Sequence, residues 1–415
     1  MRIVSVLVIM QVALSLWAQG LINKGAGIVV KSGAHVVVNG NFLNKIGTQD
    51  GFVKLDGNLI VKGDFINNAS NEVFDIPSPL TNGWLIMPST TLQKFRGSSA
   101  VRVNNLELSG MTKRIDMPEV KVVGTCKLAA ILELNGHIFH LESSDPASLQ
   151  YQSGYIKAET TPQDGLGYIR WDVGNANGNF NLPFGSGNSS YADLNLTLHL
   201  TQAGDNTGYF MCSTYGTLVA NMPYPSGVTT LDPYTEKEVA NRFWIITPVF
   251  QNFPTGSITF QYTHYDIQGM DETLLKAANY DESQNLWTAW PVVFSDQMNN
   301  LLQTDLIQFS SVDYRWTLVS REEGFYLYMP TCFSPNGDGV NDFFVPVISG
   351  DYYDFELSIY DRWGQLVFYS TDPTLGWDGT FKGEKAQQDV YVVKLKYRDP
   401  KNEWKIVIDK VLIVR

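Results

Sequence analysis

Short apolar-alternating segments, each closed by Asn or Gly, recur through the first third of the chain. Residues 35–44 align with residues 58–67 at an offset of 23 residues, and shorter echoes follow at 101–108 and 131–138. One such unit cannot bury its apolar face alone, whereas stacked copies can. The pattern predicts a parallel β-helix-like β-solenoid over residues 19–160, with Asn and Gly at corners that need positive φ. The alternative is a meander of antiparallel hairpins.

The pattern changes in residues 161–325, where the echoes stop. Aromatic or β-branched runs alternate there with Gly, Asn, Asp and Pro, which favours a central antiparallel β-sandwich. A short helix is expected only over 271–280. The expected strands are 168–173, 193–200, 209–214, 242–247, 257–262, 287–293 and 316–320.

The last segment, residues 326–415, alternates again. Phe355, Leu357 and Ile359 are separated by more polar residues, which is typical of a half-buried strand. Two further strands are expected at 390–397 and 405–414. We expect a small Ig-like β-sandwich here, which makes the fold class of the whole chain all-β.

The N-terminus has the pattern of a targeting segment. Arg2 precedes an apolar run from Ile3 to Leu14, and the small residue Ala18 follows at a cleavage position before Gln19. The pattern predicts a signal peptide over residues 1–18 and secretion of the chain; a buried first strand is the alternative. The run is shorter than the ~20 residues that span a bilayer, so no transmembrane span is expected.

Composition excludes some classes of function. The chain has 30 Lys and Arg against 42 Asp and Glu, and no basic run stands out, so we expect no nucleic-acid partner. Cys126, Cys212 and Cys332 are widely spaced, which predicts neither a disulfide scaffold nor a zinc site. All three are expected to be buried small hydrophobic residues.

No catalytic constellation stands out in the sequence. Neither an H-E-x-x-H nor a G-x-S-x-G motif occurs, and the acids of residues 19–160 are scattered. We therefore expect no catalytic residue and no enzyme activity. Five tryptophans could stack on sugar rings, although core positions are the favoured interpretation: Trp84, Trp171, Trp244, Trp287 and Trp290.

One loop has the composition of a calcium site. Asn336, Asp338, Asn341 and Asp342 offer side-chain oxygens with Gly between them, as in loops that wrap one cation. The EF-hand pattern is incomplete, because Val347 stands at its twelfth position. A turn in which Asn and Asp bond their own backbone is favoured over structural calcium, and no other cofactor is expected.

Four motifs follow one another in the last segment. They lie at 333–342, at 359–364 with 366–368, at 377–380 and at 390–393. Together they resemble the gliding motility-associated C-terminal domain, the type B sorting domain of type IX secretion cargo in the Bacteroidota. Residues 386–389 depart from the family, which often has Pro or Gly there. The residues that carry the resemblance are Pro335, Asn336, Gly337, Asp338, Gly339, Asn341, Asp342, Tyr360, Asp361, Arg362, Trp363, Gly364, Trp377, Asp378 and Gly379.

The resemblance implies a route rather than an activity. It implies export through the periplasm and across the outer membrane, with the type IX outer-membrane machinery as partner, to the cell surface or the extracellular space. For the remaining residues we expect a structural or adhesin-like protein with a surface glycan or protein ligand. The alternative is a carbohydrate-active surface enzyme, a polysaccharide lyase or hydrolase built on the β-solenoid.

Overall fold

The computed structural model describes residues 17–18, 20–76, 82–159, 165–321, 326–349, 352–398 and 403–414. The chain divides into two compact units, Met1–Ser320 and Arg321–Arg415. The described residues contain strands and two 3₁₀ turns, Pro146–Ser148 and Glu272–Leu274, but no α-helix. The expected signal peptide lies outside the described residues except for Trp17 and Ala18, which form β1.

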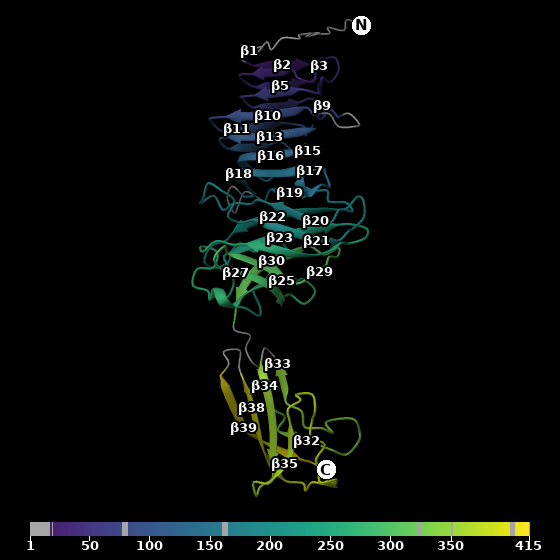
Figure 1. Cartoon of the computed structure of the whole chain (residues 1–415), viewed down its shortest axis with the longest axis vertical. Coiled ribbons are helices and arrows are strands. Elements are labelled where there is room, and N and C mark those ends of the chain that lie inside the picture. The colour runs from purple at the N-terminus through teal and green to yellow at the C-terminus, as the bar shows by residue number, and fades with distance from the viewer. Residues whose placement is uncertain are drawn as a thin grey trace. The chain divides into compact units, whose positions relative to one another are not determined.

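The first part of unit 1 is a β-solenoid of about six turns, whose coils follow one another in Figure 1. Its strands form three faces. The first face contains β1 (Trp17–Ala18), β4 (His35–Val38), β7 (Asn58–Val61), β10 (Trp84–Ser89), β13 (Asn105–Gly110) and the starts of β16 (Cys126–Glu133) and β18 (Leu149–Lys157). The second contains β2 (Leu21–Lys24), β5 (Phe42–Lys45), β8 (Phe65–Asn68), β11 (Gln93–Gly97), β14 (Lys113–Asp116) and the ends of β16 and β18. The third contains β3 (Gly27–Val30), β6 (Phe52–Leu55), β9 (Phe74–Asp75), β12 (Val101–Val103), β15 (Glu119–Val122), β17 (Ile138–Leu141) and β19 (Tyr168–Trp171).

The sequence echo corresponds to the pairing of neighbouring coils. β4 pairs with β7 in parallel and sets Val38 beside Val61. β5 pairs with β8 in the same way and sets Phe42 beside Phe65. The predicted solenoid is therefore confirmed, and the hairpin alternative, which requires antiparallel pairing, is wrong.

Two ladders of like side chains fill the inside of the second face. Phe65 stacks on Phe42 and packs against Phe95, with ring centroids 4.9 and 6.2 Å apart. Asn44 and Asn67 are also fully buried, and Asn44 Nδ2 donates to Asn67 Oδ1 at 3.2 Å. Buried amides need hydrogen-bond partners, and in-register stacking supplies one on the next coil.

The Asn and Gly residues at the corners of the solenoid do not all have the positive φ that the sequence indicated. Positive φ is found at Asn135 and Gly136, as expected, but not at Gly40 or Gly63. Gly63 is needed for another reason, because a Cβ there would lie 2.4 Å from Oδ1 of Asn41 on the preceding coil. The expectation of positive φ at every Asn and Gly corner is thus wrong, and close approach of the coils explains this glycine.

The third face of the solenoid continues into antiparallel sheet. β19 pairs in parallel with β17 and antiparallel with β22, so the sheet runs across the boundary predicted at residue 160. The nine-stranded sheet adds β22 (Tyr209–Gly216), β23 (Arg242–Val249), β30 (Tyr314–Ser320), β25 (Leu275–Asp281) and β26 (Leu286–Trp290). A six-stranded sheet contains β20 (Gly178–Leu182), β21 (Leu196–Gln202), β24 (Thr255–Gln261), β28 (Leu301–Thr304), β27 (Val292–Asp296) and β29 (Ile307–Gln308).

One hydrophobic core extends from the solenoid into these sheets, from Val30 to Leu318. Trp244 on β23 packs edge-on against Phe260 on β24, with ring centroids 5.1 Å apart. The short helix expected over 271–280 is wrong: a 3₁₀ turn at Glu272–Leu274 leads directly into β25. β25 pairs with a strand on each side, and these ladders outweigh the helical preference of the segment.

Unit 2 has its own core around a five-stranded sheet. The strands are, in order, β32 (Cys332–Phe333), β39 (Trp404–Ile413), β38 (Val390–Arg398), β34 (Tyr353–Tyr360) and β35 (Leu366–Ser370). Two short pairs accompany it, β31 (Tyr326–Tyr328) with β33 (Val347–Ser349) and β36 (Thr380–Phe381) with β37 (Glu384–Lys385).

The cysteines are not all buried. Cys126 and Cys212 lie in the core as expected, and burial raises the pKa of the Cys126 thiol to about 12. Cys332 is exposed, so the expectation is wrong for this residue. The cause is strand alternation in β32, which turns Phe333 into the core and its neighbour outward.

Candidate functional site

The four motif segments of unit 2 converge at one end of its sheet. β34 ends at Tyr360, which lies opposite Val392 near the start of β38. β38 begins at Val390, opposite Leu412, and β32 sets Phe333 beside Ile413. In Figure 1 the C-terminus lies at the same end of this unit as β32 and β35. The turns that follow Phe333 and Tyr360 therefore lie at the same end of the sheet as Ile413.

Trp377 joins the first, third and fourth motifs. Its ring is fully buried, with its centroid 5.5 Å from Phe333 and 4.8 Å from Tyr391. The indole Nε1 donates to the carbonyl of Thr380 at 2.8 Å. Gly379, with φ +72°, lies against Pro335, and a Cβ there would be 2.8 Å from the proline Cγ. These motif residues build the end of the unit by packing.

The loop over 336–342 is organised by Asp342. Its Oδ1 accepts from the backbone amides of Asn336 at 3.0 Å and Gly337 at 2.6 Å, and Oδ2 accepts from Gly339 at 2.8 Å. These amides favour the charged form, so the pKa of Asp342 is lowered. Asp338 Oδ1 accepts from the Val340 amide at 2.8 Å.

The four residues considered as calcium ligands lie in one loop, and oxygens of Asn336, Asp338 and Asp342 accept from backbone amides within it. Asn336 Oδ1 accepts from the Asp338 amide at 2.9 Å, and Asn336 Nδ2 donates to Asp338 Oδ2. Asn341 contributes a left-handed backbone conformation, with φ +54°. Among the described residues no group of three or more His, Cys, Asp or Glu side chains is placed to hold a metal ion.

The second motif forms an exposed turn after β34, beside Asp389. Asp361 Oδ1 accepts from the amides of Trp363 and Gln365 at 2.9 and 2.8 Å, and Gly364 has φ +82°. Arg362 lies 5.4 Å from the Trp363 ring centroid and 3.4 Å from the Asp389 carboxylate. Trp363 itself is 84% exposed. The indole therefore lies mostly in solvent, outside the core of this unit.

Comparison with protein families decides what this unit is. Residues 327–408 match the family model of the CHU_C type IX secretion signal domain. The C-terminal unit is a type IX secretion signal domain. The sorting domain predicted from the four motifs is thereby confirmed, and it marks the protein for export by the type IX system to the cell surface or the extracellular space.

No curated protein matches the chain. Within the described ranges, no helix has the length and apolar character needed to cross a membrane.

Unit 1 gathers charges that sequence reasoning missed. Arg102, Lys121, His140 and Arg170 occupy one register column on the outside of the third face. Glu142, Glu72, Glu119 and Asp172 surround them, so the acids are not scattered here as the sequence had indicated. The sequence feature that could have revealed this cluster is the 19-residue spacing from Arg102 to Lys121 and from Lys121 to His140, which is shorter than the 23-residue echo.

Each of these four residues, together called the charged row, is paired with a carboxylate. Arg102 binds Glu142 at 2.6 Å, and Lys121 Nζ lies 2.7 Å from Glu72 and 3.4 Å from Glu119. His140 bridges two carboxylates, with Nδ1 2.9 Å from Glu119 and Nε2 2.9 Å from Asp172.

The two carboxylates decide the protonation of His140. Burial lowers the pKa of the imidazole, but hydrogen bonds to Asp172 and Glu119 outweigh burial and leave the pKa raised. Burial raises the pKa of Asp172, yet bonds from His140 and Arg170 leave it lowered. These contacts favour the protonated imidazole, in which each ring nitrogen donates to one carboxylate.

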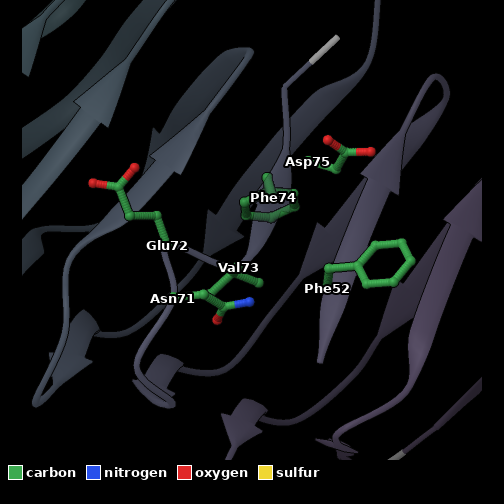
Figure 2. A pocket seen from close by; sticks show the side chains of 6 residues that line it. All are labelled: Phe52, Asn71, Glu72, Val73, Phe74 and Asp75. Carbon is green, nitrogen blue, oxygen red and sulfur yellow. The ribbon is translucent and has the colours of Figure 1, made fainter. Parts of the chain in front are cut away.

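A pocket of about 340 Å³ opens on the same face, lined by Phe52, Asn71, Glu72, Val73, Phe74 and Asp75. In Figure 2 the Phe52 ring and the Glu72 carboxylate stand on opposite sides of it. Phe52 is 41% exposed, and its ring lies over Gly27, where a Cβ would be 2.7 Å away. Glu72 also binds Lys121, so the pocket adjoins the charged row.

The five tryptophans considered as sugar-stacking residues are mostly core. Trp171, Trp244 and Trp287 are at most 2% exposed. Trp84 and Trp290 are half-buried, and Lys127 Nζ lies 4.3 Å from the Trp84 ring centroid. The favoured interpretation as core is confirmed for the first three.

Proposed function

We propose that the protein is a surface or secreted structural, adhesin-like protein whose solenoid binds a glycan or protein ligand. The observation that carries the proposal is the pocket at Phe52. An exposed aromatic ring and the Asp75 carboxylate on neighbouring strands offer stacking and hydrogen bonding, the two contacts that sugar rings use. Val73, a β-branched residue, lines this pocket with φ +73°, and strained backbone of this kind concentrates at functional sites.

The paired charges beside the pocket favour binding over catalysis. A general acid or base must exchange a proton with substrate, and both nitrogens of His140 are already engaged by carboxylates. The charged row instead suits a stable outer surface. A carbohydrate-active enzyme remains the alternative, and Glu72 at the pocket rim is the acid that such an enzyme would use.

The experiment is a binding screen with turnover measured in parallel. The chain without its sorting domain, residues 19–320, is placed on glycan and matrix-protein arrays, and each ligand retained is then incubated with the protein and analysed for products. We expect retention that Phe52→Ala and Asp75→Asn abolish, with no product. Ile22→Ala, an exposed residue on another face, is the matched control. Product release that Glu72→Gln abolishes would establish the enzyme instead.

We further propose that the export machinery reads the motif-bearing end of the sorting domain. Support comes from Trp363, which the turn after β34 exposes at the end of the sheet where the motif segments lie. The route to that machinery begins with the signal peptide over 1–18, which delivers the chain to the periplasm.

The finer architecture belongs to the same proposal. The contact of Trp244 with Phe260 supports a central sandwich of the nine- and six-stranded sheets. The five-stranded sheet with β31, β33, β36 and β37 beside its core supports an Ig-like sorting domain.

A further inference from the structure

Among the described residues of the sorting domain, most of β39 has no partner strand on one side. Every residue from Trp404 to Leu412 pairs with β38 on one side. On the other side, the described strands pair only with Leu412 and Ile413, through β32. An edge strand of this length is a template for another strand.

The orientation of the open backbone groups follows from the pairing with β32. The Leu412 amide donates to the carbonyl of Thr331 at 2.9 Å, so it points away from β38. Backbone groups alternate along a strand, and those of Trp404, Ile406, Ile408 and Lys410 therefore point to the open edge as well. The Lys410 amide donates to the side chain of the neighbouring Asp409 at 2.8 Å, and no described strand pairs with it on this side.

This edge exposes three large apolar side chains on one face of the strand. Trp404, Ile406 and Ile408 lie on the outer face and are 46, 55 and 67% exposed. Edge strands in soluble proteins are normally protected by charges, proline or bulges. Here Lys405 and Asp409 are the charges available on the other face, four residues apart with Val407 midway between them.

This spacing makes β39 complementary to itself. We propose that β39 pairs antiparallel with β39 of a second copy of this chain, across a two-fold axis at Val407. The register sets Lys405 opposite the partner's Asp409, and Asp409 opposite the partner's Lys405. It sets Ile406 against the partner's Ile408 and Trp404 against the partner's Lys410. Opposite charges and apolar pairs directly across a ladder are the stabilising combinations.

Neighbouring registers are less favourable. An axis at Ile406 sets Glu403 opposite the partner's Asp409, which brings two carboxylates together. An axis at Ile408 sets Trp404 opposite the partner's Leu412, which already pairs with β32. Axes at Lys405 or Asp409 place like charges on each other. Lys405 lies 2.7 Å from Glu403 within one chain, and in the dimer the partner's Asp409 joins this pair.

Sedimentation velocity of residues 19–415 over about 1 to 100 µM tests the proposal. We expect a dimer whose population rises with concentration. Lys405→Glu and Asp409→Lys should each weaken dimerisation by about tenfold or more, because each introduces like charges across the axis twice. The double variant Lys405→Glu/Asp409→Lys should restore it. A monomer over the whole concentration range would overturn the proposal. A dimer whose affinity neither single variant changes would overturn it as well.

Disulfide trapping tests the register and remains informative if a charge variant folds poorly. In a Cys332→Ser background, Val407→Cys places two thiols directly across the axis at a pair without backbone hydrogen bonds, where Cα atoms lie ~4.5 Å apart. We expect a covalent dimer on mild oxidation. Lys410→Cys is the matched control, because the two copies of residue 410 lie on opposite sides of the axis, each three residues from it. Equal trapping of both variants would contradict the register.

Discussion

The rings of Phe42 and Phe65 lie nearly parallel on neighbouring coils of the solenoid, with centroids 4.9 Å apart and 13° between their planes. Phe65 also packs against Phe74 and Phe95 and is fully buried. These ring contacts link neighbouring coils and place Phe65 at the centre of the packed interior.

Removal of the central ring should therefore be costly. Phe65→Ala deletes a buried phenyl that coils on both sides enclose, and we expect a loss of about 3–5 kcal/mol in the free energy of unfolding. Ile22→Ala on the same face, where the side chain is 61% exposed, should change it by less than about 0.5 kcal/mol. Urea denaturation measures both. Equal effects would mean that the stack does not carry stability.

The charged row predicts a pH dependence. Because the folded-state pKa of His140 is raised, the protonated imidazole stabilises the fold below its ordinary pKa of about 6.5, and this contribution is lost as pH rises through the folded pKa. Asp172 and Glu119 have lowered pKa values, so their contribution is lost only in acid. Melting temperatures of wild type and His140→Gln should converge as pH rises above neutrality. Parallel curves would refute the bridged imidazolium.

The loop over 336–342 should depend on Asp342 rather than on calcium. Asp342→Ala removes the acceptor of three backbone amides, and we expect a lower melting temperature of the sorting domain without any added metal. Glu384→Ala, an exposed acid on β37, is the control. Calorimetry with millimolar calcium or with a chelator should give the same transition. A rise with calcium that Asp338→Ala abolishes would revive the calcium interpretation.

The exposed indole of the second motif should matter for export alone. Trp363→Ala changes no buried contact, so we expect normal folding with cell-surface delivery reduced by about tenfold. Tyr353→Ala is the matched control, since this 55% exposed aromatic lies at the other end of β34. Surface proteolysis and fractionation compare the two. Equal delivery of both variants would exclude Trp363 as a contact of the machinery.

Some of this structure could be predicted from sequence because its information is local or repeated. The echo between 35–44 and 58–67 gave both the coil and its register, since stacked coils need the same residue types at the same positions. The sorting motifs could be recognised because Phe333, Trp377 and Tyr391 are each required for one small core.

Other features depend on contacts that no single segment reveals. The charged row joins residues from four strands. Its 19-residue spacing differs from the 23-residue echo, so a search for one fixed coil length does not find it. β25 became a strand because β26 and β30 pair with it, against its local helical pattern. The pocket at Phe52 depends on the close approach of Gly27 across coils.

Export through the sorting domain is the central claim, and truncation tests it most directly. A chain ending at Ser320 keeps the core from Val30 to Leu318 complete, so it should fold as unit 1 does. The full chain and this truncation are expressed in a bacterium that has the type IX machinery, and periplasm, cell surface and medium are assayed separately. We predict that the full chain reaches the surface or the medium and that the truncated chain accumulates in the periplasm. Delivery of the truncated chain to the surface would contradict the account.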